Sequence, residues 1–335
     1  THAELLRFTT LPWPEPLRVR ILALSQGKGN AEEVNRLNVE VAEHFAEAAK
    51  QVSGSTTIDA VASHGQTISH IGSIATLQIG NPAVLANRIG AMVVSDFRSA
   101  DVALGGQGAP LVPYADWCLL THLTKSRAIQ NIGGIGNVTC LPPNAAPEQV
   151  IGFDTGPGNM LIDLAASQLT EGELTFDKDG KLAGQGAIDF GLLERLLEHP
   201  FLKLPPPKSA GREEFGREYF EELSLSLSVD TLATLTEFTA ISIADAYQRY
   251  LPAMPEEVIV GGGGARNLFL MQRLAARLPG MEVCTHEDIG MNGDAKEALA
   301  FALLANETLL GNPASLPSVT GARKAALLGS VTFPT

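Results

Sequence analysis

Cysteine is scarce in this chain. The 335 residues include three cysteines, Cys118, Cys140 and Cys284, which lie far apart and form no C-x-x-C pair. An odd number at such spacings indicates neither a structural zinc site nor a disulfide framework. A reducing cytoplasm is therefore the expected environment.

Basic residues are also few. Lysine and arginine total 24 against 37 aspartates and glutamates, which gives a net charge of −13. Nucleic-acid-binding proteins and proteins that bind anionic membranes need basic patches, so both classes are disfavoured. Backbone N–H groups and a divalent cation can still bind a phosphorylated ligand in an acidic protein.

Long apolar runs are absent as well. No stretch approaches the roughly 18 uninterrupted apolar residues of a membrane span, and the first residues do not have the pattern of a signal peptide. The most apolar candidate helix, 295–310, contains Lys296 and Glu297 and is typical of a buried helix. With 45% hydrophobic and 18% charged residues, the chain is expected to form globular domains.

Predicted strands and helices alternate along the sequence. Apolar runs predict strands at 3–10, 58–62, 77–79, 91–94, 128–132, 138–141, 150–153, 258–260 and 281–284. Helical periodicity predicts helices at 17–24, 228–250 and 295–310, and a long one that Asn30 caps. The alternation indicates an α/β fold with largely parallel sheets, and a tight glycine turn predicts one hairpin at 128–141.

Asp154 is the most informative residue. It lies in Gly-Phe-Asp-Thr-Gly-Pro-Gly-Asn, 152–159, between a strand end and a helix predicted from about Gly158 to Gln168. Glycines let a ligand approach the backbone, and Pro157 suits the first turn of a helix. Because α/β proteins keep catalytic groups where strands end, Asp154 is the predicted general base.

Two glycine-rich turns are candidate sites for phosphate or nucleotide. The hairpin Asn131–Thr139 contains Gly133, Gly134 and Gly136, whose N–H groups can form an anion nest; a plain hairpin turn is the alternative. Four glycines at 261–264 follow another strand, but they fit neither the dinucleotide fingerprint nor a Walker loop. A structural turn explains one or two of them, and four in a row favour a bound nucleotide.

Polar residues after two other strands are candidate substrate ligands. His64 and Gln66 follow the strand 58–62, and a structural histidine is the alternative to a binding one. Asp96 and Arg98 follow the strand 91–94 and precede a glycine-rich loop around Gln107. They form either a local charge cluster or a ligand loop in which Arg98 pairs with an anionic substrate group.

Two further segments allow alternative interpretations. Lys296 and Glu297 open the last helix, where charges are ordinary, but Glu297 begins an otherwise apolar helix and is a site candidate. The loop 204–215 contains Lys208 and Glu213. A surface connection is the favoured interpretation of this loop, and a mobile lid is the alternative.

Ten segments, in this order, resemble the anhydro-N-acetylmuramic acid kinase family from one end of the chain to the other. They are 64–67, 78–82, 96–98, 105–113, 131–139, 152–159, 206–215, 233–236, 261–267 and 297–298. Each is weak alone, whereas the combination is specific. The resemblance implies a hexokinase/Hsp70/actin-like α/β fold with two domains, 1–127 and 128–335, around a central cleft, and a last helix that packs back toward the first domain.

The resemblance also implies the chemistry. Members of the family use ATP and Mg²⁺ to convert 1,6-anhydro-N-acetylmuramic acid into N-acetylmuramic acid 6-phosphate during murein recycling. Asp154 would be the base that activates water. The residues expected to bind the sugar are His64, Gln66, Asp96, Arg98, Gln107 and Glu297. Those expected to bind the nucleotide are Asn131, Gly133, Gly134, Gly136, Asn137, Gly156, Gly158, Asn159, Gly262, Gly263, Gly264 and Asn267. No metal ligand is assigned, and a cytoplasmic homodimer is expected.

The sequence departs from the family at its start. The Ser-Gly-Thr-Ser-x-Asp-Gly phosphate loop of the family and the two strands around it are missing, and an incomplete sequence is the preferred explanation. A sugar-binding sensor without phosphoryl transfer and a kinase for another sugar are the alternative functions.

Overall fold

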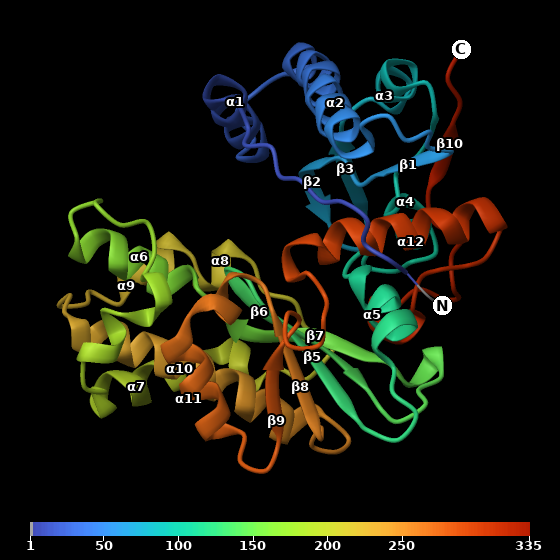
Figure 1. Cartoon of the computed structure of the whole chain (residues 1–335). Helices are drawn as coiled ribbons and strands as arrows, with labels where there is room; N and C mark the ends of the chain where they lie inside the picture. The colour runs from blue at the N-terminus through green and yellow to red at the C-terminus, as the bar shows by residue number, and fades with distance from the viewer. Residues whose placement is uncertain (1–2) are drawn as a thin grey trace. The chain divides into compact units, whose positions relative to one another are not determined.

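The computed structural model of the protein describes residues 3–335, without the side chain of Arg212. The chain divides into two compact units (Figure 1). One comprises the residues up to Leu119 together with Ala295–Thr335, and the other comprises Leu120–Asp294. The domains 1–127 and 128–335 expected from the sequence stay a prediction.

The first unit is built on a three-stranded sheet of order β1-β4-β10. β1 (Ala60–Ser63) pairs in parallel with β4 (Met92–Ser95), which pairs antiparallel with β10 (Ser330–Thr332). β2 (Gln66–Ile71) and β3 (Ala75–Ile79) form a separate antiparallel pair. The helices are α1 (Glu15–Ser25), α2 (Ala31–Ser53), α3 (Pro82–Ile89), α4 (Ser99–Ala103), α5 (Val112–Leu120), α12 (Lys296–Leu310) and α13 (Pro317–Thr320).

The first unit confirms one local prediction from the sequence and differs from two others. As predicted, Asn30 caps α2, because its side-chain oxygen accepts a 2.9 Å hydrogen bond from the Glu33 N–H. The strand predicted at 3–10 is wrong: these residues form no regular element, are mostly exposed and have no strand partner within residues 3–335. Gln66 begins β2 and does not lie in a loop after β1.

The second unit contains a five-stranded sheet of order β7-β6-β5-β8-β9. Its strands are β5 (Arg127–Ile132), β6 (Ile135–Leu141), β7 (Ile151–Pro157), β8 (Glu257–Gly261) and β9 (Glu282–Thr285). β5, β6 and β7 are antiparallel neighbours, whereas β8 and β9 continue the sheet in parallel. The expectation of largely parallel sheets is therefore wrong here, because β7 joins the predicted β5–β6 hairpin as a third antiparallel strand.

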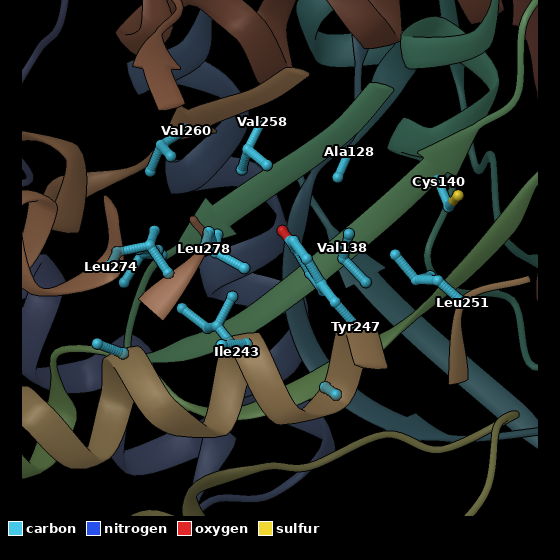
Figure 2. Packing of buried hydrophobic residues seen from close by; sticks show 14 of the residues in the cluster. Ala128, Val138, Cys140, Ile243, Tyr247, Leu251, Val258, Val260, Leu274 and Leu278 are labelled. Carbon is cyan, nitrogen blue, oxygen red and sulfur yellow. The ribbon is translucent and has the colours of Figure 1, made fainter. Parts of the chain in front are cut away.

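The second unit also contains α-helices. They are α6 (Met160–Leu169), α7 (Phe190–Leu197), α8 (Arg212–Phe215), α9 (Arg217–Glu222), α10 (Val229–Tyr250) and α11 (Leu268–Arg277). Ser228 caps α10 by accepting a hydrogen bond from the Thr231 N–H. The apolar side of α10 packs on the strands (Figure 2), and the buried Tyr247 hydroxyl donates a 2.9 Å hydrogen bond to Gln130 Oε1 of β5.

Candidate active site

Asp154 lies within β7, opposite Asn137 of β6, so its predicted place at a strand end is wrong: β7 continues to Pro157. The register of the two strands shifts between Gly136 and Asn137, so that Gly136 pairs with Gly156 and Thr155 is the additional residue of a bulge. A bulge re-aims the side chains beside it, and bulges are common next to active sites. The bulge at Thr155 thus interrupts, next to Asp154, the regular alternation of side chains between the two faces of β7.

A loop distant in sequence is hydrogen-bonded to Asp154. The Asp154 N–H donates to the Lys208 carbonyl at 3.1 Å, and the Ala210 N–H donates to Asp154 Oδ2 at 2.7 Å. Among the described groups, which exclude the Arg212 side chain, none donates a hydrogen bond to the other oxygen, Oδ1. One carboxylate oxygen is therefore held, and the other can accept a proton.

The surroundings of Asp154 suit a general base. Burial raises the pKa of Asp154 to about 6, while the Ala210 N–H and the Lys208 ammonium oppose the increase. A base is most useful when its pKa lies near the working pH, because it is then ionised and still basic. The carboxylate is mostly ionised at neutral pH and binds a proton more readily than an exposed aspartate does.

Lys208 is buried beside this carboxylate. Its Nζ atom lies 4.7 Å from the ring centroids of both Phe201 and Tyr250 and donates a 3.3 Å hydrogen bond to the Phe201 carbonyl. Burial and the charge of Arg249 lower the pKa of Lys208 to about 8, against the opposing effect of Asp154. The favoured interpretation of 204–215 as a surface connection is therefore wrong for Lys208.

The β5–β6 turn packs directly on the start of α6. The N–H groups of Gly158 and Asn159 donate to the carbonyls of Gly134 and Gly133 at 2.9 and 2.7 Å, and Asn159 Nδ2 donates to the Ile132 carbonyl at 3.0 Å. A Cβ atom on Gly158 would lie 2.2 Å from the Gly133 carbonyl oxygen. Gly158 is therefore needed for the contact between the β5–β6 turn and the start of α6. Its N–H group already donates to the Gly134 carbonyl.

The four glycines after β8 have different surroundings. A Cβ on Gly262 would lie 2.7 Å from Asn131 Oδ1, and one on Gly264 would lie 2.4 Å from the Ile132 side chain. A Cβ on Gly261 would meet the His286 ring at 2.7 Å. Gly263 alone has room, with Asn159 Nδ2 at 3.5 Å as its nearest neighbour. Three glycines thus allow close packing, and Gly263 has room for a side chain.

Gly263 lines a cavity of about 540 Å³. The cavity also contacts Asn159 and Asn267, both predicted from the sequence, and Arg266 from the short 3₁₀ helix Gly263–Arg266. Asp163 of α6 lines it too, and burial together with the negative charge of Asp177 raises the pKa of Asp163 to about 6. The cavity combines an exposed glycine, amide groups, a cation and a carboxylate.

In the first unit, the predicted residues His64 and Arg98 contact each other. Arg98 Nε donates a 2.9 Å hydrogen bond to His64 Nε2, and Arg98 Nη1 donates a 2.7 Å bond to the Gly108 carbonyl. His64 Nδ1 lies 2.8 Å from the Gly65 carbonyl, so Nδ1 carries the proton of the neutral ring. Burial and the positive charge of Arg98 lower the pKa of His64 to about 4.

A cavity of about 440 Å³ lies beside this pair. His64 and Asp96 line it, together with Ser63 and Ser95 at the ends of β1 and β4. The exposed Asp96 accepts a 2.5 Å hydrogen bond from the Ser99 hydroxyl. The sequence thus predicted two of the groups around this cavity.

The remaining sugar-site candidates lie outside that cavity. Arg98, Gln66 and Gln107 do not line it. Glu297, exposed in the first turn of α12, acts electrostatically on Arg98, whose pKa burial lowers and the carboxylate raises. Arg98 therefore links the glutamate to His64.

Sequence reasoning missed several residues that the structure places at these sites. Phe176, Asp177 and Lys178 line the cavity beside Gly263, although only the polar, glycine-rich character of their segment was visible in the sequence. Asp163 gave no signal beyond its position in the first turn of a predicted helix. Lys208 was visible only as one charge in a loop rich in proline.

Within residues 3–335, no group of three or more histidine, cysteine, aspartate or glutamate side chains is arranged to hold a metal ion. In the same part of the chain, no helix is long and apolar enough to cross a membrane.

Comparisons with known proteins identify relatives over nearly the whole chain. The family model for anhydro-N-acetylmuramic acid kinase matches residues 1–334. A protein of that name from Acaryochloris marina is 47% identical, with 98% of this chain and 92% of that protein covered. Another, from Caldanaerobacter subterraneus subsp. tengcongensis, is 44% identical over 99% of this chain and 90% of its own length.

Solved structures match more weakly. A ROK family glucokinase from Streptomyces griseus, in complex with glucose and AMPPNP, has a TM-score of 0.37 at 12% identity, with 79% of this chain and 87% of that chain covered. A xylulose kinase from Lactobacillus acidophilus has a TM-score of 0.39 at 13% identity, with 79% and 52% covered. These scores carry no argument about the site.

Proposed function

We propose that this chain, which belongs to the anhydro-N-acetylmuramic acid kinase family, is an ATP-dependent sugar kinase that opens the 1,6-anhydro ring of anhydro-N-acetylmuramic acid and phosphorylates O6. The product is N-acetylmuramic acid 6-phosphate, an intermediate of murein recycling. The non-catalytic sensor is not favoured, since the relatives are named as kinases. The half-buried carboxylate of Asp154, with one oxygen held and one available, is the observation that carries the proposal.

Asp154 acts as the base in the proposed reaction. Its carboxylate takes a proton from a water molecule, whose oxygen attacks the anomeric carbon of the sugar. The bond between that carbon and O6 breaks, and O6 attacks the γ-phosphorus of ATP. The bond from the γ-phosphorus to the bridging oxygen then breaks, ADP leaves, and the proton on Asp154 passes to solvent. One base thereby serves both ring opening and phosphoryl transfer.

We assign the nucleotide to the cavity of about 540 Å³ in the second unit. The exposed ring of Phe176 offers a stacking surface for a base, and Arg266 and Lys178 supply positive charge in an otherwise acidic protein. Gly263 allows close approach to the backbone, and Asn159 links this cavity to the β5–β6 turn. Of the remaining glycines of the predicted set, all except Gly133 are closely packed, because an added Cβ would lie within 3.0 Å of another atom.

Mg²⁺ fits this donor set without a protein cage. Mg²⁺ usually keeps several waters and binds one or two carboxylates together with substrate phosphates. Asp163 lines the nucleotide cavity and would supply such a carboxylate. When bound, the ion neutralises phosphate charge as the γ-phosphoryl group is transferred.

Sugar recognition is assigned to the first unit. Arg98, held by His64 and the Gly108 carbonyl, presents a fixed cation suited to the carboxylate of a muramic acid. Asp96 would accept hydrogen bonds from sugar hydroxyl groups. Gln66, Gln107 and Glu297 are the other proposed sugar-binding residues. We also propose that the protein is a homodimer located in the cytoplasm.

A direct assay tests the function. The protein is incubated with ATP, Mg²⁺ and anhydro-N-acetylmuramic acid, and ADP release is followed with the appearance of the sugar 6-phosphate. We expect the two products in equal amounts. Folded protein that forms neither product would refute the kinase assignment, whereas ADP without sugar phosphate would refute the coupling. N-acetylmuramic acid and N-acetylglucosamine serve as comparison substrates for sugar specificity.

A further inference from the structure

The segment 208–210 is bonded to the proposed base at both its main chain and its side chain. The Asp154 N–H donates to the Lys208 carbonyl at 3.1 Å, and the Ala210 N–H donates to Asp154 Oδ2 at 2.7 Å. The second bond joins residues 56 positions apart in the sequence. Any movement of this segment would therefore change the orientation of the Asp154 carboxylate.

The Lys208 side chain has an unusual environment. It is 9% exposed, and its ammonium lies over the rings of Phe201 and Tyr250, each at 4.7 Å. Among the described residues no ion pair to it is found, and its hydrogen bond goes to the Phe201 carbonyl. Cation–π contacts compensate part of the lost hydration, but burial of an unpaired ammonium is still unfavourable.

Two neighbouring charges act on this ammonium. Arg249 of α10 disfavours the charged form of Lys208, and Asp154 favours it. Arg249 is itself paired with Asp245 at 3.6 Å on the same helix. The attraction between Lys208 and Asp154 is mutual, so the lysine in turn favours the ionised carboxylate.

We propose that Lys208 is a positioning residue for Asp154: the main chain of Lys208 orients the carboxylate, and the Lys208 ammonium, buried over Phe201 and Tyr250, favours the ionised carboxylate. This inference rests on the proposed role of Asp154 as the base. A lysine that only filled space between Phe201 and Tyr250 would affect folding stability but would leave the ionisation of Asp154 unchanged. The two roles therefore predict different pH profiles.

Two substitutions at Lys208 separate charge from packing. Lys208→Met keeps a long, flexible side chain between the rings and removes the charge, while Lys208→Arg keeps the charge. The matched control is Lys203→Met, which removes an exposed lysine from the preceding segment. For each full-length protein, kcat/KM for the sugar is measured from pH 5 to 9 at saturating ATP and Mg²⁺, alongside the melting temperature.

In Lys208→Met, we expect the fall of kcat/KM in acid, the acid limb of the pH profile, to shift to higher pH by about 0.5–1 unit. The reason is that a positive charge near Asp154 has been lost. Lys208→Arg and Lys203→Met should keep the wild-type limb. The wild type and Lys208→Met should converge above pH 8, where Asp154 is ionised in both proteins. An acid limb of folded Lys208→Met that coincides with that of the wild type would overturn the inference.

Two further measurements keep the test decisive. If Lys208→Met does not fold, Lys208→Gln also removes the charge, with a more polar side chain, and is expected to move the same limb upward; an unmoved limb overturns the inference. Asp154→Asn distinguishes the proposed role of Asp154 as the base from the proposed role of Lys208. Normal turnover in that variant would refute the base itself, whereas an inactive Asp154→Asn with an unmoved Lys208→Met limb would refute only the role of Lys208.

Discussion

The Ala210 N–H donates a 2.7 Å hydrogen bond to Asp154 Oδ2, so a loop far along the chain holds one oxygen of the proposed catalytic carboxylate. The arrangement fixes the side chain and leaves Oδ1 to accept a proton. It also places the base in partly buried surroundings, where its pKa is about 6.

The activity should fall in mild acid. Asp154 must be ionised to take a proton from water, and its pKa is about 6. We expect kcat/KM for the sugar to be constant between pH 7 and 8 and to fall about tenfold per pH unit well below pH 6. Because kcat/KM reports the free enzyme, this profile is the appropriate measurement. A profile that stays flat to pH 4.5 would contradict the assignment of Asp154.

Asp154 should also reduce folding stability at neutral pH. Its pKa is raised from 3.8 to about 6 in the folded protein, so the folded state binds the proton more tightly than the unfolded state does. This group therefore favours folding most in acid, and that contribution is lost as the pH rises through about 4 to 6.

Removal of the charge should then stabilise the protein. We expect Asp154→Asn to gain about 1–2 kcal/mol at pH 7.5, or about 2–6 °C in melting temperature. The gain should shrink at pH 5, where wild-type Asp154 is mostly protonated. Thermal unfolding at both pH values measures it, and a lower melting temperature of the variant at pH 7.5 would contradict the expectation.

Two glycines should differ sharply on substitution by alanine. In Gly158→Ala the new Cβ would meet the Gly133 carbonyl oxygen at 2.2 Å, so the contact between the β5–β6 turn and α6 cannot form. In Gly263→Ala the nearest atom lies at 3.5 Å, and the methyl group enters the nucleotide cavity. We expect Gly158→Ala to fold poorly, and Gly263→Ala to fold normally with a higher KM for ATP.

Melting temperatures and ATP titrations separate these two effects. Gly172→Ala, at an open position with φ of +88°, controls for backbone strain without contact. A normal KM for ATP in Gly263→Ala would remove that cavity as the nucleotide site.

Arg98→Lys should weaken sugar binding. The guanidinium uses Nε on His64 and Nη1 on the Gly108 carbonyl, a fork that one ammonium cannot reproduce. We expect KM for the sugar to rise about tenfold, the effect of about 1.4 kcal/mol of lost interaction, with KM for ATP unchanged. Arg88→Lys, an exposed pair with Glu43, is the matched control. An equal rise in both KM values would indicate general loosening of the fold.

The sequence predicted the elements around Asp154 better than the contacts between them. The hairpin 128–141, the Asn30 cap and the strand before Gly261 follow from local patterns, and the structure confirms them. The strand predicted at 3–10 failed because strands need partners, and periodicity does not identify a partner. The mixed sheet likewise depends on pairings among distant segments.

The candidate site shows the same limit. Asp154 and Gly263 stand out through composition, whereas Lys208 gains its importance from burial between two rings that local sequence does not indicate. Similarly, four consecutive glycines looked equivalent in the sequence, and only the packing of Asn131, Ile132 and His286 distinguishes Gly263 from the others.

Single-turnover formation of the sugar 6-phosphate by Asp154→Asn tests the role of Asp154 most directly. The variant is mixed with ATP, Mg²⁺ and anhydro-N-acetylmuramic acid, and ATP binding is measured on the same preparation. We expect product formation at least about a hundredfold slower than in the wild type, as for removal of a general base, with ATP binding retained. Product formation at a rate near that of the wild type would contradict the role of Asp154 as the base.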